Sequence, residues 1–557
     1  MSSRRALLIL LNLLLPLTVT AQQSAPPTNT QSDPDTQTPV QTPPPTATTP
    51  TPTASAQPAT QPDAAPYTVH VTTRLVVLDM VVVNKKGEVI HDLKRENFHV
   101  QEEGTPQTIE HFEASGAHSV PADAKIESTA DLDRLAPRAP VDIILLDEFN
   151  TRFEDMAFAR YSLKKFLEKQ PDILPAPTML IAVDLQDFKV LRDYTRNKNE
   201  ILNALDHHFV KYPWQAHNNS WVSERYATAF TTLRRVAEAV MGHPGHKNMI
   251  WIGRGFPAIN WSGIPIDSHN RVQNAVQNCV NLLRDARVTL YTIDPAGVQV
   301  NPGDWGTSDP FGGNYEFNRL AKATGGRTLY GRNDVDREIT TAVQDGSSFY
   351  TLAYRPTEST PDLNKFRHIS VTVDRPDLTV ITRPGYYLRM KPGVVNPEKP
   401  SQRLVSDLNA ADSSNMAYDG VRFTVERSAS EPEHFIVHVD GHSLVWTAAT
   451  ESEPRRSEIV LIGSTFDKKD KELSREARMI RSNAPASSPA TGRILINLKL
   501  PFELKVPPHA VRARFTVRVS ATSRIGTFDI DLTKPVETPA TPAASTSPAQ
   551  PSGSANQ

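Results

Sequence analysis

Residues 141–151 read VDIILLDEFNT, and the interpretation of the whole chain starts from this stretch. Four large apolar residues in succession, beginning at Ile143, are followed at once by Asp147, Asn150 and Thr151. A short run of this kind is typical of a central strand that is buried on both faces of a sheet. Its carboxyl end opens into the crevice where open α/β sheets bind ligands. We therefore expect the functional site beside Asp147.

Outward from this strand, the chain between residues 138 and 348 alternates strand patterns with helix patterns. TMLIAVD (178–184), NMIWIG (248–253) and VTLYTID (288–294) are further short apolar runs. The stretches between them carry apolar residues every three to four positions, which is the spacing of an amphipathic helix. Strands separated by helices imply a mostly parallel sheet with helices on both faces. The sequence predicts a doubly wound α/β domain.

Strand patterns without helices stand on both sides of this domain. Residues 67–137 and residues 349–390 are each rich in β-branched strand patterns, and each set alone would form a small sheet with an uncovered face. We expect the two sets to pair into one small β-sandwich that brackets the α/β domain. After a predicted polar link over 391–417, regular strand patterns over 418–533 predict a C-terminal all-β sandwich.

The two ends of the chain have a different composition. Residues 1–21 combine a basic start, an apolar run and small residues, which predicts a secretory signal peptide cleaved after Ala21. The apolar run is shorter than the roughly 20 residues of a membrane-spanning helix, and no later stretch predicts a span. Residues 22–66 and 534–557 are rich in Pro, Thr, Ala and Ser, which predicts a disordered linker and a disordered tail. We expect an exported protein, either periplasmic or secreted.

Charge and cysteine content narrow the classes of partner. The chain has 557 residues with 60 Lys and Arg against 62 Asp and Glu, so its net charge is only -2. This balance gives no electrostatic footprint for nucleic acid. The single cysteine, Cys279, has no intramolecular disulfide partner. The expected partner is a protein or a component of the cell envelope, and the oligomeric state stays open.

Six segments, in order along the chain, resemble the von Willebrand factor type A related domain of acidobacterial exported proteins. These segments are DLKRENFHVQEEGTPQTIEHF, IILLDEFNT, NMIWIGRGFP, LYTIDPAG, FYTLAYRP and RPGYY. The resemblance covers roughly residues 67–390. It implies a type A fold and a role in binding other macromolecules.

The resemblance also implies where a cation would bind. Type A domains usually hold one divalent cation through a D-x-S-x-S loop, a Thr from a second loop and an Asp from a third. In this chain Asp147 and Thr151 match the first loop, but Phe149 stands at the middle Ser. The third loop reads Gly-Arg-Gly over residues 253–255, where the family has the Asp.

Because hard cations such as Mg²⁺ and Mn²⁺ prefer about six oxygen ligands, this set predicts a degenerate metal site. Asp147 and Thr151 are the candidate metal ligands, and Thr228 or Thr231 is a candidate for the second-loop Thr. The alternative is that Asp147 and Thr151 cap the helix that follows. We expect no resident cofactor, with Mg²⁺ or Mn²⁺ as the alternative.

Two loops place aromatic residues among polar neighbours, on what should be the same edge of the sheet. Residues 211–221 read KYPWQAHNNSW, and residues 253–267 read GRGFPAINWSGIPID. Exposed aromatic residues of this kind suit a recognition surface. Asp294 ends a strand on the same side, either to reach the crevice or to form a turn with Pro295. The predicted partner-binding residues are Trp214, Trp221, Arg254, Phe256, Trp261 and Asp294.

These features favour a binding protein that mediates protein–protein interaction or adhesion through its carboxyl-end loops. One alternative is a metal-assisted hydrolase that uses the crevice carboxylates of Asp147 and Asp294. It would need a separate catalytic base and a water-excluding pocket, and the sequence names neither. The other alternative is an envelope structural protein. We therefore do not expect an enzyme.

Overall fold

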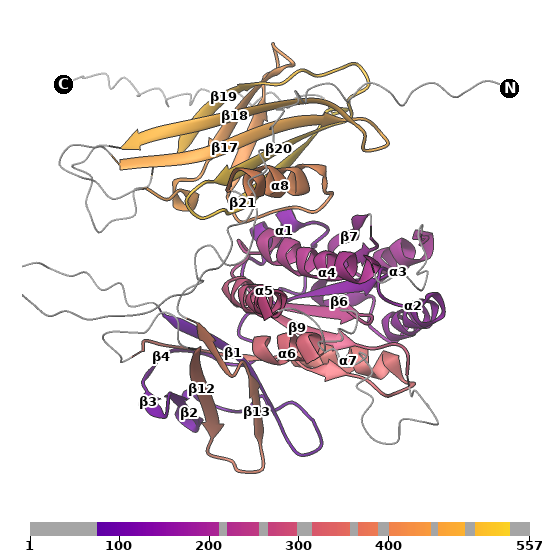
Figure 1. The fold of residues 1–557 in the computed structure, drawn as a ribbon, viewed down its shortest axis with the longest axis vertical. Coiled ribbons are helices and arrows are strands. Elements are labelled where there is room, and N and C mark those ends of the chain that lie inside the picture. The colour runs from indigo at the N-terminus through magenta and orange to yellow at the C-terminus, as the bar shows by residue number, and fades with distance from the viewer. Residues whose placement is uncertain are drawn as a thin grey trace, which may run out of the picture. The chain divides into compact units, whose positions relative to one another are not determined.

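The computed structural model describes residues 75–185, 187–210, 220–255, 266–297, 315–356, 366–387, 400–446, 455–484 and 496–534 (Figure 1). The predicted signal peptide, the predicted linker over 22–66 and nearly all of the predicted tail lie outside these residues. Within them the chain forms a mixed α/β part with a six-stranded sheet, together with several antiparallel sheets.

The six-stranded sheet is the centre of the α/β part. Its order is β10-β9-β8-β5-β6-β7, and all neighbours are parallel except β6 and β7, which are antiparallel. β5 is therefore an interior strand, and all seven of its residues are buried. The strands are β5 (Val141–Asp147), β6 (Ile173–Val183), β7 (Phe188–Asn197), β8 (Lys247–Ile252), β9 (Val288–Ile293) and β10 (Thr328–Leu329).

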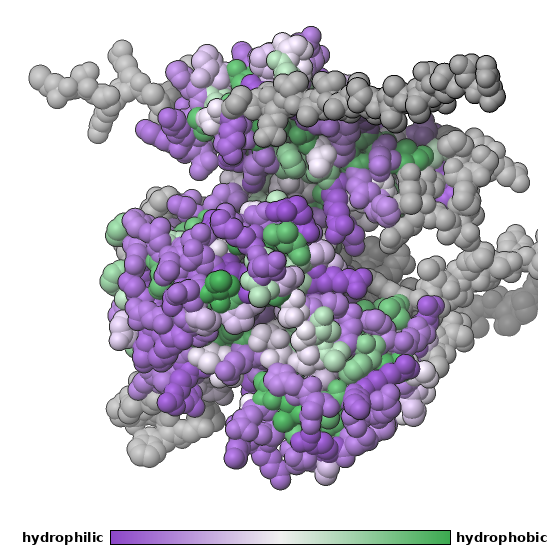
Figure 2. Space-filling view, turned by 180° about the vertical axis from the view of Figure 1, so that it is seen from behind, coloured by the Kyte–Doolittle hydropathy of each residue, from purple (hydrophilic) through white to green (hydrophobic). Residues whose placement is uncertain are grey.

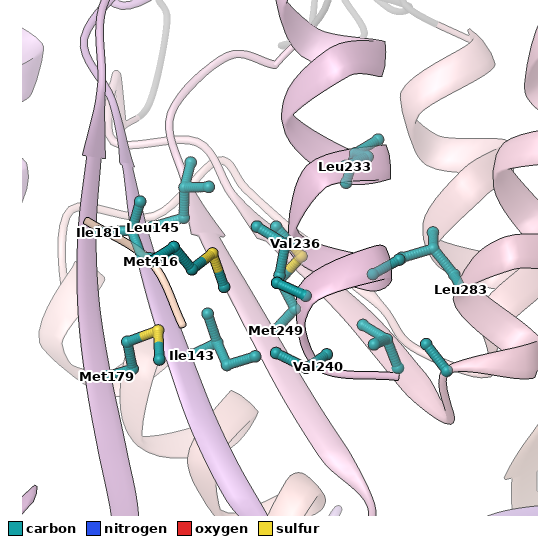
Figure 3. Packing of buried hydrophobic residues seen from close by; sticks show 14 of the residues in the cluster. Ile143, Leu145, Met179, Ile181, Leu233, Val236, Val240, Met249, Leu283 and Met416 are labelled. Carbon is teal, nitrogen blue, oxygen red and sulfur yellow. The ribbon is translucent and has the colours of Figure 1, made fainter. Parts of the chain in front are cut away.

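Helices cover both faces of this sheet because successive residues of a strand point to opposite faces. Ile143 and Leu145 of β5 pack into one cluster with α1, α4, α5 and α6, whereas Ile144 and Leu146 pack into a second cluster with α2, α3 and α7. Figure 3 shows part of the first cluster. The helices are α1 (Thr129–Leu135), α2 (Phe153–Glu168), α3 (Lys198–His207), α4 (Ser220–Ala239), α5 (Ile266–Asp285), α6 (Tyr315–Thr324) and α7 (Val335–Ser347).

Asp142 is an acidic residue inside the buried strand β5, and it makes stability depend on pH. Its Oδ1 accepts a hydrogen bond from Nδ2 of Asn248 at 2.8 Å. Burial raises the pKa of Asp142 to about 7, although the Asn248 bond opposes the rise. The folded protein keeps a proton that the unfolded chain loses near pH 4, so the free energy of unfolding falls as pH rises from about 4 to about 7.

We expect Asp142→Asn to remove this part of the pH dependence, because an amide accepts the same hydrogen bond and does not ionise. The variant should match the wild type near pH 4 and exceed its stability at pH 8 by roughly 4 kcal/mol at most. Urea unfolding at both pH values measures the difference. Asp123→Asn, at an exposed position, is the control. An unchanged slope in Asp142→Asn would show that Asp142 is ionised in the folded protein.

The strands before and after the α/β part pair with each other into two small antiparallel sheets. Their orders are β13-β1-β11-β4 and β14-β12-β2-β3. Each sheet combines strands from both chain segments, as the sequence patterns led us to expect, and the two sheets enclose one cluster of buried apolar residues. The elements are β1 (Val76–Val83), η1 (Arg95–Asn97), β2 (Phe98–Glu102), β3 (Thr105–Gln107), β4 (Ile109–Glu113), β11 (Tyr350–Tyr354), β12 (Phe366–Val373), β13 (Thr379–Thr382) and β14 (Gly385–Tyr387).

The C-terminal part contains two further antiparallel sheets, with orders β15-β16-β19 and β18-β17-β20-β21. Their inner faces share one apolar cluster that contains Phe435, Phe502 and Phe515. The elements are β15 (Phe423–Arg427), β16 (His434–Val439), η2 (Gly441–Ser443), β17 (Arg455–Phe466), β18 (Glu472–Ala484), β19 (Leu498–Glu503), β20 (Arg512–Val519) and β21 (Ile525–Asp531).

The predicted polar link over 391–417 differs from the structure, because it contains the helix α8 (Pro400–Ser413). Leu408 of this helix packs against Val460 and Ile462 of β17. Met416, just beyond the helix, is buried in the first cluster of the α/β part, where Figure 3 shows it beside residues of the sheet. The segment is thus part of the core and is more than a spacer.

Hydrophilic residues predominate on the face shown in Figure 2, and hydrophobic residues occur there in small separate groups. Among the described residues, we find no helix that is both long enough and apolar enough to cross a membrane.

Candidate functional site

The candidate site lies at the carboxyl end of β5, where Asp147 is completely buried. Its two carboxylate oxygens accept three hydrogen bonds from N–H groups. Oδ1 accepts from the Asn150 amide at 2.9 Å, and Oδ2 accepts from Trp251 Nε1 at 3.1 Å and from the Gly255 amide at 2.6 Å. Burial raises the pKa of Asp147 to about 7, whereas these bonds and the charge of Arg225 lower it.

The loop after β8 folds over this carboxylate. The Arg254 amide donates to Thr151 Oγ1 at 3.1 Å, and Asn150 Nδ2 donates to the Gly255 carbonyl at 3.1 Å. Gly253 allows the close approach, because a Cβ there would lie 2.4 Å from the Asp147 Cβ. We call Asp147, Asn150, Thr151 and residues 253–255 the β5 cap. Its polar atoms are joined to one another by hydrogen bonds.

The same geometry corrects the helix-capping alternative for Asp147 and Thr151. Helix α2 begins at Phe153 with Arg152 at its N-cap, and it has no side-chain capping hydrogen bond. The oxygens of Asp147 and Thr151 accept from the loop and from Asn150 instead. The side chain of Phe149 is buried against Trp251 in an edge-to-face contact, with ring centroids 6.1 Å apart.

Arg254 and Asp294 form an ion pair beside the cap. The Arg254 Nη2 lies 3.5 Å from Asp294 Oδ2, and the Arg254 side chain is 23% exposed whereas that of Asp294 is 1% exposed. Asp294 Oδ1 accepts from the Ala296 amide at 3.0 Å, so the turn that the sequence offered as an alternative is present. Asp294 therefore holds the Arg254 side chain through this ion pair. Its own carboxylate is buried, so it does not offer a contact surface to a partner.

The ion pair predicts a pH-dependent effect of Arg254→Met. Burial raises the pKa of Asp294, and Arg254 opposes that rise. Without the guanidinium, the pKa of the buried Asp294 carboxyl rises further. Keeping it ionised at pH 8 should therefore cost the variant about 1–3 kcal/mol, with much less lost at pH 4, where the folded carboxyl group keeps its proton. Urea unfolding at both pH values is the measurement. Arg332→Met, which breaks an exposed pair with Asp334, is the control. An equal loss at both pH values would contradict this role of Arg254.

Two further charged groups near the end of β5 were not singled out from the sequence. Glu148 is buried and lies 2.8 Å from His208 Nε2. Arg225 of α4 is buried, and its Nη1 donates to Asn150 Oδ1 at 3.4 Å. The sequence carried a signal for Arg225, because it stands four residues before Ala229 and eight before Leu233, on the apolar side of the predicted helix.

The other predicted site residues lie outside the β5 cap or outside the described residues. Thr228 and Thr231 line a cavity of about 210 Å³ between α4 and the carboxyl end of β6, together with Asp184 and Arg235. Trp221 falls within helix α4, but its side chain lies outside the described part of the structure. Trp214, Phe256 and Trp261 also lie outside the described residues.

Comparisons with known proteins find similarity among solved structures. No family model matches the chain, and no curated protein sequence matches it. Among solved structures, the chain is similar to the crystal structure of manganese-loaded Plasmodium vivax TRAP protein. The sequence identity is 12% and the TM-score is 0.24, and the match covers 44% of this chain and 94% of that chain.

Proposed function

We propose that this protein is an exported binding protein, which recognises a protein partner through the loops at the carboxyl edge of its six-stranded sheet. The observation that carries the proposal is the β5 cap. Three hydrogen bonds tie the loop after β8 to the end of β5, because the Gly255 amide donates to Asp147, the Arg254 amide donates to Thr151 Oγ1, and Asn150 Nδ2 donates to the Gly255 carbonyl. A loop anchored in this way loses little conformational entropy when a partner binds to it or to the residues beside it, which favours recognition.

We further propose that this edge works without a divalent cation. A metal ligand needs a lone pair directed at the cation, but the Asp147 oxygens accept three hydrogen bonds and Thr151 Oγ1 accepts one, which leaves about one acceptor position on each side chain. Arg254 adds a positive charge beside the cap, and it would repel a second cation. The donor set therefore does not fit Mg²⁺ or Mn²⁺, which prefer about six oxygen ligands.

The hydrolase alternative receives less support from the same residues. Asp147 and Asp294 are both buried, and burial raises the pKa of both. Raised pKa values in neighbouring carboxylates can indicate catalysis. Here, however, the Asp147 oxygens accept hydrogen bonds within the cap. The Asp294 carboxylate pairs with Arg254 and accepts a hydrogen bond from the Ala296 amide in its own turn. These contacts favour a structural role for both carboxylates.

The proposal can be tested with the whole chain on an array of secreted and cell-envelope proteins. The test variant replaces Trp214, Arg254 and Trp261 with alanine. The control variant replaces three residues outside the cap whose side chains are exposed, namely Tyr161, Met479 and Arg481.

We expect at least one array protein to bind the wild type and the control variant equally, in EDTA as well as in Mg²⁺. The loop variant should bind the same array protein at least tenfold more weakly. Equal binding by the loop variant would place recognition on another surface. Binding that disappears in EDTA would show that the edge needs a cation.

A further inference from the structure

A cavity of about 260 Å³ lies at the opposite end of the sheet from the β5 cap. It is lined by the start of β1, the continuous stretch from the end of α5 to the start of β9, the last residue of α6, and the stretch from Arg383 after β13 to Tyr386 in β14. Val288, the first residue of β9, marks this as the amino end of the parallel strands. Residues on its wall include Leu75, Val76, Val77, Val288 and Tyr386.

Three guanidinium groups and two carboxylates also line this cavity. Arg287 pairs with Asp79, with its Nη2 2.6 Å from Oδ1, and Arg284 pairs with Asp285, with its Nη2 2.8 Å from Oδ1. Asp79 also accepts from Thr351 Oγ1 at 2.7 Å and contacts His246 at 3.2 Å. Both carboxylates are thus engaged, and one guanidinium remains.

That remaining guanidinium belongs to Arg383. Its Nη2 donates to the Val77 carbonyl at 2.6 Å, but its Nε is buried and makes no hydrogen bond. Within the described ranges, no carboxylate lies at ion-pair distance from it. Burial, and next the neighbouring charge of Arg284, lower the pKa of Arg383 to about 10. Arg383 as a whole is half-buried, and a partly desolvated cation without a counter-ion is unfavourable, which a bound anion would relieve.

We propose that this cavity binds a small organic carboxylate, with its acid group at Arg383 and its hydrocarbon part against Leu75, Val77 and Val288. Three arginines against two aspartates leave a surplus of one positive charge, which a monoanion balances and a phosphate dianion exceeds. A guanidinium matches the planar geometry of a carboxylate through paired hydrogen bonds. The aliphatic side chains of the wall favour a ligand with an apolar part over a bare inorganic ion.

The backbone beside Arg383 is held closely in place. Gly325, in the turn after α6, has φ +89°, and a Cβ there would lie 2.9 Å from the Arg383 backbone nitrogen. The Thr382 hydroxyl, one residue earlier, donates to the Asp79 carbonyl at 3.0 Å. The Arg383 side chain therefore starts from a fixed backbone, as a preorganised binding group requires. The site does not depend on the proposed recognition of a protein partner.

Isothermal titration of the whole chain tests this site with three probes: hexanoate, the neutral hexanol and inorganic phosphate. We expect saturable binding of one hexanoate per chain, with hexanol and phosphate at least tenfold weaker. Arg383→Met should weaken hexanoate binding at least tenfold. Arg375→Met, which removes an exposed arginine paired with Asp92, is the matched control and should leave binding unchanged.

A second variant covers the case in which Arg383→Met does not fold, as judged by circular dichroism. Leu75 is 42% exposed, so Leu75→Trp should narrow the cavity without removing a charge, and it should also weaken hexanoate binding. Three results would overturn the proposal. They are no saturable hexanoate binding to the folded wild type, binding of hexanol or phosphate as tight as that of hexanoate, or hexanoate binding that neither variant weakens.

Discussion

Gly253→Ala is expected to lower the free energy of unfolding by about 2–5 kcal/mol, because the new methyl group combines a steric clash with backbone strain. Its Cβ would lie 2.4 Å from the Asp147 Cβ and 2.6 Å from Thr151 Oγ1, and Gly253 has φ +146°. Neither neighbour can move away easily, since both accept hydrogen bonds within the β5 cap. Urea unfolding of the whole chain measures the loss.

Gly331→Ala is the control for a positive φ without a steric clash. Gly331 also has a positive φ, of +71°, but a Cβ there would meet nothing within 4 Å. It should therefore cost only about 1–2 kcal/mol, which is the cost of the left-handed conformation alone. If Gly253→Ala costs no more than Gly331→Ala, the loop after β8 does not press on Asp147, and the description of the cap is wrong.

Arg514→Met is the second substitution with a large expected effect. Arg514 of β20 is 1% exposed, and it donates to Asp529 through Nε at 2.8 Å and Nη2 at 2.6 Å. Its Nη1 donates to the carbonyls of Ala411, Ser414 and Met416. Asp529 is 38% exposed and keeps Arg512 as a partner, so the loss comes mainly from these buried carbonyls, each of which typically costs about 1–3 kcal/mol when its donor is removed. We expect a loss of this size in urea unfolding, together with faster amide exchange around Met416.

Arg512→Met is the matched control for Arg514. Arg512 lies on the same strand and contacts the same Asp529 at 2.9 Å, but its side chain is 23% exposed and it makes no described bond to the segment after α8. A partly solvated pair of this kind contributes at most about 1 kcal/mol. Equal losses in the two variants would mean that the three carbonyl contacts add nothing to stability.

The sequence predicted those parts of the fold that depend on strong apolar patterns. The run beginning at Ile143 indicated an interior strand, and the structure places β5 inside the sheet. Helix α8 was missed because only Leu404, Leu408 and Ala411 mark its apolar side among polar neighbours. β6 begins earlier than predicted, at Ile173. Pro175 and Pro177 argued against a strand there, and the irregular register with β7 accommodates them.

The candidate site was less accessible to sequence reasoning. Asp147 and Thr151 could be placed because they follow an apolar run, but their role depends on main-chain amides of Asn150, Arg254 and Gly255. Every residue except proline has such an amide, so no residue pattern marks these donors. Trp251 carried a weak signal, because a buried indole N–H requires an acceptor. The Arg383 cavity gave no signal, since its walls come from four separate stretches of chain.

The central claim is that the β5 cap is held by hydrogen bonds within the protein, without a cation. The most direct measurement is thermal unfolding of the whole chain in EDTA and then in millimolar Mg²⁺ or Mn²⁺, beside Asp147→Asn. A cation at 100 times its dissociation constant would add about 2.7 kcal/mol to the stability. We predict no change in the midpoint for either protein. A rise of several degrees in the wild type that is absent in Asp147→Asn would contradict the claim and establish a cation site at Asp147.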